Sequence, residues 1–487
     1  MGQLRQNGWS GLPRSRYCPT LRAGPKGRAL AASLVADIRG GVLAPGERLP
    51  GSRALAQRLG LARGTVAQVL ADLEAEGWLH QEAGSGTFVR ADLLAARPPE
   101  KSASAHLGFP LRDAPALRRR LEVPEAEYRL VGGRADLRLL PLTELARAYR
   151  RVLRGRGRRL VDYGPPRGTS RLRGSLRGWL GRQRGLAPTD RGLLVTRGSQ
   201  QAIYLLARAL LRPGDVVAVE ALGYPPAWAA LRAAGATLFP LPVDDEGARV
   251  DQIPDHVRAV YLTPHHQYPT GATLSAPRRQ RLLAQAARCG FAVLEDDYDH
   301  EYHYEGAPVP PLASDDPAGV VVSIGTLSKA FAPGLRLGWV VAPPPLIDQL
   351  VAWRTMIDRQ GDQVVEHAVA ELLDEGTLDR HLRRTRRHYQ ARRDTLLRAL
   401  ARRLPQVTPL PRPGGLALWC RVEGNDVDAW AERCQQRGVF FETASAYTLD
   451  GRALPWARLG FAGHDEGELL DAVERMRAAW PSIEGQG

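Results

Sequence analysis

Apolar residues in the first ninety positions recur at the spacing of three short helices. In the first helix, over residues 27–41, apolar residues fall at i, i+4 and i+8. A second, short helix has Leu55 and Leu59 on one side and is expected to be capped by Ser52. The third has an apolar stripe over residues 63–76. WLHQ and TFVR are typical of two short strands around the turn EAGSG. This pattern indicates a winged helix-turn-helix, although a generic three-helix bundle has the same helical periodicity.

Apolar, strand-like runs alternate with amphipathic helices over the rest of the chain. The runs are GLLVT, VVAVE, AVYLT, FAVLEDD, VVVSIG and GWVVAP, and the helices are expected at residues 202–211, 227–234 and 277–289. The alternation predicts an α/β domain with a largely parallel sheet over residues 127–481. Two stretches without a period flank the winged helix-turn-helix of residues 27–91: a flexible arm at residues 1–26 and an interdomain linker at residues 92–126.

The composition favours a soluble chain of several domains in a reducing compartment. The 487 residues are 44% apolar and 24% charged, which is enough for large buried cores. No run of about 18 apolar residues occurs, and the start MGQLRQNGWSGLP has no apolar segment, so neither a membrane span nor a secretory signal is expected. The four cysteines form no CxxC pair and are too few for a disulfide framework, which predicts a cytoplasmic location.

Positive charge is concentrated near the amino-terminal end. The net charge is +15, and residues 1–91 hold eleven Arg and one Lys against six acidic residues, which gives +6. Even spreading would give this part of the chain about +3. A basic end indicates nucleic-acid binding, although a solvated surface face has the same composition, so charge alone leaves both open.

Lysine is so rare in this chain that one position stands out. Only three of the 67 basic residues are lysine, namely Lys26, Lys101 and Lys329. Arginine stays protonated, whereas lysine can lose its proton and act as a nucleophilic amine. Chance explains Lys26 and Lys101 in their loop-like surroundings, but Lys329 follows an apolar strand among small residues in VVVSIGTLSKAFAPGLRLGW. We therefore expect covalent chemistry at Lys329.

Four polar clusters follow predicted strands of the larger domain: RGSQQA, PHHQYPTG, EDDYD and GTLSK. Ligands of parallel sheets bind beyond the carboxyl ends of the strands, so these clusters are expected to meet at one site. Pyridoxal phosphate needs a primary amine, a carboxylate at its ring nitrogen, a stacking aromatic, and hydroxyls, free N–H groups and an arginine at its phosphate. The clusters supply these groups, which predicts pyridoxal 5′-phosphate as the cofactor.

The amino-terminal domain resembles the GntR-type winged helix almost end to end. The resemblance lies in GVLAPGERLPGSRALAQRLGLARGTVAQVLADLEAEGWLHQEAGSGTFV, with its PGxxLPxSRxLAxxLGxxRxTV core. The third helix is expected to enter the major groove of double-stranded operator DNA. The residues expected to contact DNA are Ser52, Arg53, Arg63, Thr65, Ser85 and Gly86. Ala62 departs from the family, which usually has a capping serine there, and the loss of such a cap costs about 1 kcal/mol.

Residues from about 127 to 481 resemble a fold-type I aminotransferase with a large and a small subdomain, and together with the winged helix they resemble the MocR/GabR subfamily of GntR-type regulators. The resemblance implies that Lys329 forms an internal aldimine with the cofactor, that Asp296 pairs with its ring nitrogen and that Tyr298 pairs with its ring hydroxyl. It assigns the remaining cofactor contacts to Tyr224, which stacks on the ring, to Ser199, Gln200, Thr326 and Arg336 at the phosphate, and to Tyr163 of a second subunit in a homodimer. Arg458, in WARLGFAG, matches the arginine that holds an effector carboxylate, and no metal is expected.

Two positions depart from related proteins. Catalytic aminotransferases usually have Asn before the Pro of NPxG, where this chain has Tyr268 in HHQYPTG. The MocR/GabR subfamily shares this change, which puts efficient transamination in doubt rather than cofactor binding. Pro226 stands where the GABA-responsive member has an effector-contacting arginine, so GABA is not expected as the ligand.

Three functions follow from these observations. The first is a regulator whose aminotransferase-like domain senses an amino compound (an amino acid, an amine or pyridoxal phosphate itself) and has at most partial transaminase activity. The second is a working aminotransferase that also binds DNA, and the third is a regulator whose second domain is an empty dimerisation scaffold. The first is favoured, and the retained Lys329, Asp296 and Tyr298 argue against the third.

Overall fold

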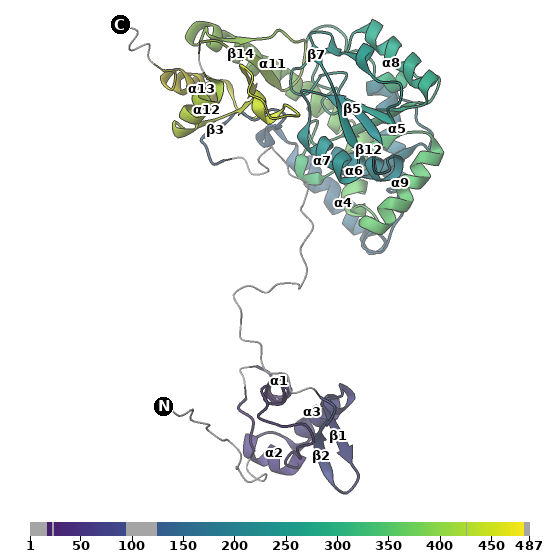
Figure 1. The fold of residues 1–487 in the computed structure, drawn as a ribbon, viewed down its shortest axis with the longest axis vertical. Coiled ribbons are helices and arrows are strands. Elements are labelled where there is room, and N and C mark those ends of the chain that lie inside the picture. Colours follow the sequence, from purple (N-terminus) through teal and green to yellow (C-terminus); the bar gives the residue numbers. More distant parts are fainter. Residues whose placement is uncertain (1–16, 22–23, 94–123, 425, 482–487) are drawn as a thin grey trace, which may run out of the picture. The chain divides into compact units, whose positions relative to one another are not determined.

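The computed structural model describes residues 17–21, 24–93, 124–424 and 426–481 (Figure 1). These residues form two compact units, which divide between residues 112 and 113, inside the predicted linker. Most of that linker, and most of the predicted arm, lies outside the described residues. No helix in the described ranges is long and apolar enough to cross a lipid bilayer.

The smaller unit is a three-helix fold with a hairpin, as the periodicity predicts. Its elements are α1 (Lys26–Arg39), α2 (Ser52–Leu59), α3 (Arg63–Ala75), β1 (Leu79–Glu82) and β2 (Gly86–Val89). The two strands pair antiparallel, and the predicted apolar stripes meet in one core that includes Leu30, Leu34, Leu55, Val66 and Leu70. The winged helix-turn-helix is thereby confirmed.

The amino-terminal caps of this unit differ from the prediction. Ser52 does not cap α2: it is the first helical residue, and Gly51 takes the N-cap position in an extended conformation without a side-chain hydrogen bond. Ala62 occupies the N-cap position of α3, also without a side-chain bond, because alanine has no acceptor. Within the predicted arm, Tyr17 packs against the core and its hydroxyl donates to Asp37 at 2.6 Å.

The larger unit is organised around a sheet with, among the described residues, seven strands in the order β4-β12-β11-β10-β9-β5-β6. Their bounds are β4 (Leu193–Thr196), β5 (Val216–Glu220), β6 (Thr237–Leu241), β9 (Ala259–Leu262), β10 (Ala292–Asp297), β11 (Val321–Thr326) and β12 (Gly338–Val341). Neighbours from β11 to β6 pair in parallel, whereas β12 pairs antiparallel with both β4 and β11. The largely parallel sheet is confirmed, and the GWVVAP run is its antiparallel strand.

Helices cover both faces of this sheet, so residues of both faces are buried. Val217 and Val219 of β5 pack in one core with residues of α6, α7 and α9, while Ala218 packs in another with α8. The helices of the larger unit are α4 (Leu142–Leu160), α5 (Ser170–Arg184), α6 (Gly198–Leu210), α7 (Pro225–Ala233), α8 (Ala276–Cys289), α9 (Pro344–Ile357), α10 (Gln363–Asp374), α11 (Thr377–Arg403), α12 (Val427–Gln436) and α13 (Glu466–Ala478).

The carboxyl-terminal part of the unit forms a small subdomain. Its sheet has, in the part of the chain that the structure describes, four antiparallel strands in the order β13-β14-β17-β16. They are β13 (Val407–Pro409), β14 (Ala417–Val422), β17 (Trp456–Gly460) and β16 (Glu442–Thr443). Beside it, β15 (Val439–Phe440) pairs in parallel with β3 (Tyr128–Arg129), so the start of the larger unit lies on the small subdomain.

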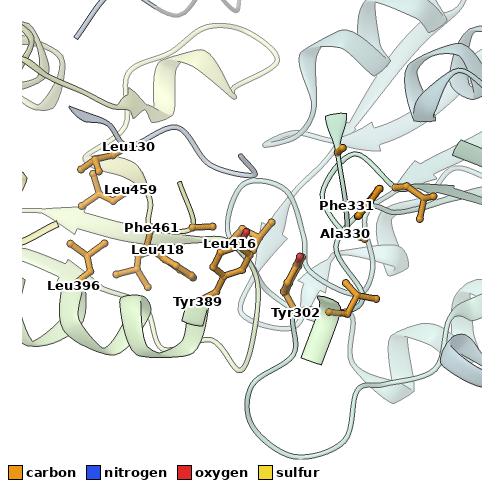
Figure 2. Close-up of a cluster of buried hydrophobic side chains, with 14 of the residues drawn as sticks. Leu130, Tyr302, Ala330, Phe331, Tyr389, Leu396, Leu416, Leu418, Leu459 and Phe461 are labelled. Carbon is orange, nitrogen blue, oxygen red and sulfur yellow. The ribbon is translucent and has the colours of Figure 1, made fainter. Parts of the chain in front are cut away.

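One hydrophobic core extends between the small subdomain and the main sheet. Figure 2 shows Tyr302, Ala330 and Phe331 in the same cluster as leucines of β14 and β17. The buried hydroxyl of Tyr302 donates to the backbone carbonyl of Lys329 at 3.2 Å. The backbone at Lys329 and the two residues after it is therefore held by this core, which fixes where the Lys329 side chain begins.

Candidate functional site

A cavity of about 160 Å³ lies beyond the carboxyl ends of β9, β10 and β11. Eight of the ten residues that the sequence assigns to the cofactor and effector line it: Ser199, Gln200, Tyr224, Asp296, Tyr298, Thr326, Lys329 and Arg336. The polar clusters converge because parallel strands end at the same edge of the sheet.

The carboxylate of Asp296 has one oxygen that no group in the described residues satisfies. Asp296 lies near the end of β10 and is buried, its Oδ2 accepts a hydrogen bond from the Tyr261 hydroxyl at 2.7 Å, and its Oδ1 has no partner there. Burial raises the pKa of Asp296 to about 7, against the lowering effects of the Tyr261 hydrogen bond and of the Lys329 charge. Such a group suits a ring N–H, whose hydrogen bond and positive charge would stabilise the carboxylate.

The lining at Ser199, Gln200 and Arg336 is suited to an anion. Ser199 and Gln200 lie in the first turn of α6, where backbone N–H groups have no helical partner. Gly198 precedes them with φ +76°, and a Cβ at this position would lie 2.9 Å from Nη2 of Arg336. Only glycine therefore lets the arginine approach the helix end, next to the buried hydroxyl of Thr326.

Lys329 faces a segment whose lack of side chains gives it room. Gly133 has φ +76°, and a Cβ there would lie 3.3 Å from the Lys329 Nζ. A Cβ on the adjacent Gly132 would lie 2.1 Å from Nη1 of Arg458. The backbone of Gly132 and Gly133 thus lies between the Lys329 amine and the Arg458 guanidinium. Because Gly132 is part of the cavity wall, Arg458 lies beside the cavity.

Arg458 is a buried cation with unused donors. It lies on β17 with 3% of its surface exposed, and its Nε and Nη1 are buried with no hydrogen-bond partner in the part of the chain that the structure describes. Its guanidinium carbon lies 4.3 Å from the ring centroid of Tyr268, which in turn packs edge-on against Tyr224 and Tyr298. Buried guanidinium donors without a partner are costly, and a carboxylate ligand would satisfy them.

Tyr163 lies outside this cavity. Its ring is 75% exposed, and the guanidinium carbon of Arg359 lies 4.1 Å from its centroid. The predicted contact of Tyr163 is with the cofactor of a second subunit, so it stays a prediction.

Several residues of the cavity wall escaped the sequence analysis. Tyr261 is the hydrogen-bond donor to Asp296, and Ser328 accepts from the Thr326 hydroxyl at 2.9 Å. The signals were present, since Tyr261 is a polar residue in the apolar run AVYLT and Ser328 directly precedes Lys329. Gly132 gave only a weak signal, because nothing in its local sequence shows that it contacts Arg458.

The predicted DNA-contacting residues lie in the smaller unit, at the starts of α2 and α3 and in the wing. Arg53, Arg63 and Ser85 are exposed, whereas Ser52, Thr65 and Gly86 are partly buried. Gly86 has φ +124°, and a Cβ there would lie 2.8 Å from Nε of Arg48. Arg48 therefore adds to the charge beside the wing, and the sequence analysis did not single it out.

Comparison with known families divides the chain at the same place. Residues 26–89 match the family described as bacterial regulatory proteins, gntR family, and residues 133–476 match aminotransferase class I and II. The second match includes Arg458 and every residue that lines the cavity except Gly132.

Individual relatives are similar along either the whole chain or its larger unit. The probable rhizopine catabolism regulatory protein MocR of Rhizobium meliloti is 31% identical over 95% of both chains. The HTH-type transcriptional regulator TauR of Rhodobacter capsulatus is 34% identical, covering 91% of this chain and 94% of its own. Among solved structures, the α-aminoadipate aminotransferase LysN of Thermus thermophilus, complexed with N-(5′-phosphopyridoxyl)-L-leucine, has a TM-score of 0.67 and 30% identity, covering 72% of this chain and 91% of its own.

Proposed function

Because this chain belongs to the MocR/GabR subfamily of GntR-type regulators, in which a winged helix precedes an aminotransferase class I and II domain, we propose that it senses an amino compound in the cytoplasm and thereby controls transcription from a DNA operator. The observation that carries the regulator function is coverage. Regulators match more than nine-tenths of this chain, whereas the aminotransferase LysN matches 72%. An enzyme alone has no use for the winged helix.

Pyridoxal 5′-phosphate is the cofactor of this fold, and the residues of the cavity fit it. Asp296 would hold the ring nitrogen with its unpartnered Oδ1, and the first turn of α6 with Arg336 would hold the phosphate. Tyr298 would hold the ring hydroxyl, and Tyr224 would cover the ring face. When bound, the cofactor supplies an aldehyde carbon that bonds primary amines reversibly.

Lys329 and Arg458 give this cavity the means to sense an amino compound. Lys329 provides the resident amine, with which the amine of a ligand competes for the same carbon. The unpartnered Nε and Nη1 of Arg458 provide the site for a carboxylate, on the other side of the Gly132–Gly133 backbone. The class of effector is therefore an amino acid, or another amine with an acidic group.

A second candidate function, transamination, is favoured by the same residues. Lys329, Asp296 and Tyr298 line one cavity, as transaminase chemistry requires. Tyr268 is the residue that counts against transamination, because it stands where catalytic relatives have asparagine. It packs among Tyr224, Tyr298 and Tyr447. Steady turnover of an amino donor with a keto acid, at a rate that DNA does not change, would establish the enzyme in place of the sensor.

Removing Arg53 or Arg63 is expected to weaken operator binding and to leave the absorption spectrum of the cofactor unchanged, because both are exposed in the smaller unit. Loss of one phosphate contact should lower the slope of log affinity against log salt by about one, and loss of a base contact should relax sequence preference at about 1–3 kcal/mol. Fluorescence anisotropy with operator DNA measures both effects. The control is Arg281→Ala, which removes the same charge from an exposed position on α8. If both winged-helix variants bind DNA as tightly as this control, the assigned DNA contacts are wrong.

The chain is expected to be a homodimer in which Tyr163 reaches the cofactor of the partner subunit. Tyr163 is 75% exposed in the single chain, so an interface could bury it. Sedimentation equilibrium at micromolar concentration should give a dimer. Tyr163→Phe should weaken cofactor retention and leave the dimer intact. A monomer with its cofactor fully bound would refute this assignment of Tyr163.

A further inference from the structure

Three histidines outside the cavity form a cluster with the geometry of a metal site. His265 and His266 follow β9, and His303 follows β10. All three are buried, and one ligand nitrogen from each lies within 4.8 Å of the others. Nitrogens bound tetrahedrally to zinc at 2.0–2.1 Å lie about 3.3 Å apart. Each pair of ligand nitrogens would therefore have to move closer by about 1.5 Å or less, a movement that the two rings of the pair would share.

Four of the six ring nitrogens of this cluster have no hydrogen-bond partner among the residues that the structure describes. Nδ1 and Nε2 of His265, Nε2 of His266 and Nδ1 of His303 are all buried without a hydrogen bond. Buried polar atoms are normally satisfied, because leaving them without a partner costs free energy. Unsatisfied nitrogens on all three rings, in a cluster where one nitrogen from each ring lies within 4.8 Å of the others, indicate a group that the protein itself does not supply.

His266 is oriented as metal-binding histidines are. Its Nδ1 lies 2.8 Å from Oδ1 of the buried Asp299, which leaves Nε2 as the free nitrogen. A carboxylate bonded to the far side of the ring fixes the tautomer and makes the ligand nitrogen more basic. Gly414 keeps a side chain away from this nitrogen, since a Cβ there would lie 2.4 Å from Nε2 and 2.6 Å from the backbone oxygen of Tyr302.

We propose that His265, His266 and His303 bind a divalent transition-metal ion of the zinc type. Imidazole ligands select such ions over magnesium or calcium, which prefer oxygen. One of the three ligands, His303, lines an adjoining cavity of about 250 Å³ together with His300, and an ion and a water as its fourth ligand would enter from this side. The sequence analysis expected no metal, although HHQ and the HxxH spacing of His300 and His303 were visible in it.

The ion would brace two segments of the cofactor cavity. Tyr268 follows His265 and His266 on one segment, and Tyr298 precedes His303 on the other. These two tyrosines pack edge-on with their centroids 5.9 Å apart, so a metal that joins the segments would fix that contact. The metal site stands independently of the effector, because its ligands do not line the effector cavity.

Metal analysis of the holo-protein tests the proposal. The full chain, purified without a polyhistidine tag and stripped with a chelator, should retain one zinc ion per chain after incubation with zinc and desalting. Cobalt in place of zinc should give the visible absorption of a tetrahedral site. Retention of no ion, together with no cobalt spectrum at micromolar metal, would overturn the proposal.

Matched variants locate the ion. His265→Asn and His303→Asn should abolish retention, and Asp299→Asn should weaken zinc affinity 10–100-fold while all three ligands remain. His256→Asn, an exposed histidine elsewhere in the larger unit, should retain zinc as the wild type does. Equal retention by the His265, His303 and Asp299 variants would place the ion elsewhere and contradict the assignment; if a histidine variant fails to fold, Asp299→Asn and the wild-type cobalt spectrum still decide.

Discussion

Replacement of Lys329 by alanine is expected to abolish both the absorption of the covalently held cofactor and the transcriptional response to the effector. The variant loses the one primary amine among the described residues that line the cavity. It should still fold and bind DNA, because Lys329 lies in the larger unit and the assigned DNA contacts lie in the smaller. Absorption spectroscopy, operator binding and a reporter assay measure the three properties.

Lys329→Arg is the matched variant that separates charge from covalent chemistry. A guanidinium stays protonated, so it keeps a positive charge in the same cavity but cannot act as a nucleophilic amine. Both variants should therefore lose the response equally. A normal response from either would mean that sensing does not depend on the lysine amine.

Replacement of Arg458 by alanine is expected to keep the cofactor absorption and to weaken a carboxylate-bearing effector by about 2–5 kcal/mol, or roughly 30- to 5,000-fold in affinity. The large effect follows from burial, since Arg458 is 3% exposed and two of its donors have no protein partner. Titration of the cofactor spectrum with amino acids measures the affinity.

An amine without a carboxylate is the internal control for this experiment. It should bind the Arg458→Ala variant and the wild type alike, because it does not use the guanidinium. Arg458→Lys should recover part of the carboxylate affinity, since it restores the charge without the bidentate geometry. Unchanged affinity for every amino acid would show that the carboxylate of the effector lies elsewhere.

The features that the sequence predicted are those that local patterns determine. The stripes in residues 27–76 gave the helices of the winged helix to within a few residues, because a buried helix face repeats every three to four positions. The cofactor cavity followed from strand ends, because the parallel order of the strands brings Asp296 and Thr326 to one edge whatever the details of packing.

Features that depend on contacts between distant segments were not predictable. The approach of Gly132 to Arg458 joins residues more than three hundred positions apart. The histidine cluster likewise needs His265 and His303 to meet across two adjacent strands. The cap of α2 is a different failure, because serine is common both at the N-cap and just inside it, and only the backbone angles of Gly51 decide between the two.

The most direct test of the account is a single titration of the wild-type protein with a panel of amino acids and amines. The cofactor spectrum and the affinity for DNA from upstream of the regulated genes are followed together. The account predicts that at least one compound changes both at the same concentration, and that Lys329→Ala loses both changes. A compound that shifts the spectrum and is steadily turned over with a keto acid, while the affinity for DNA stays constant throughout the panel, would contradict it and leave a DNA-tethered aminotransferase instead.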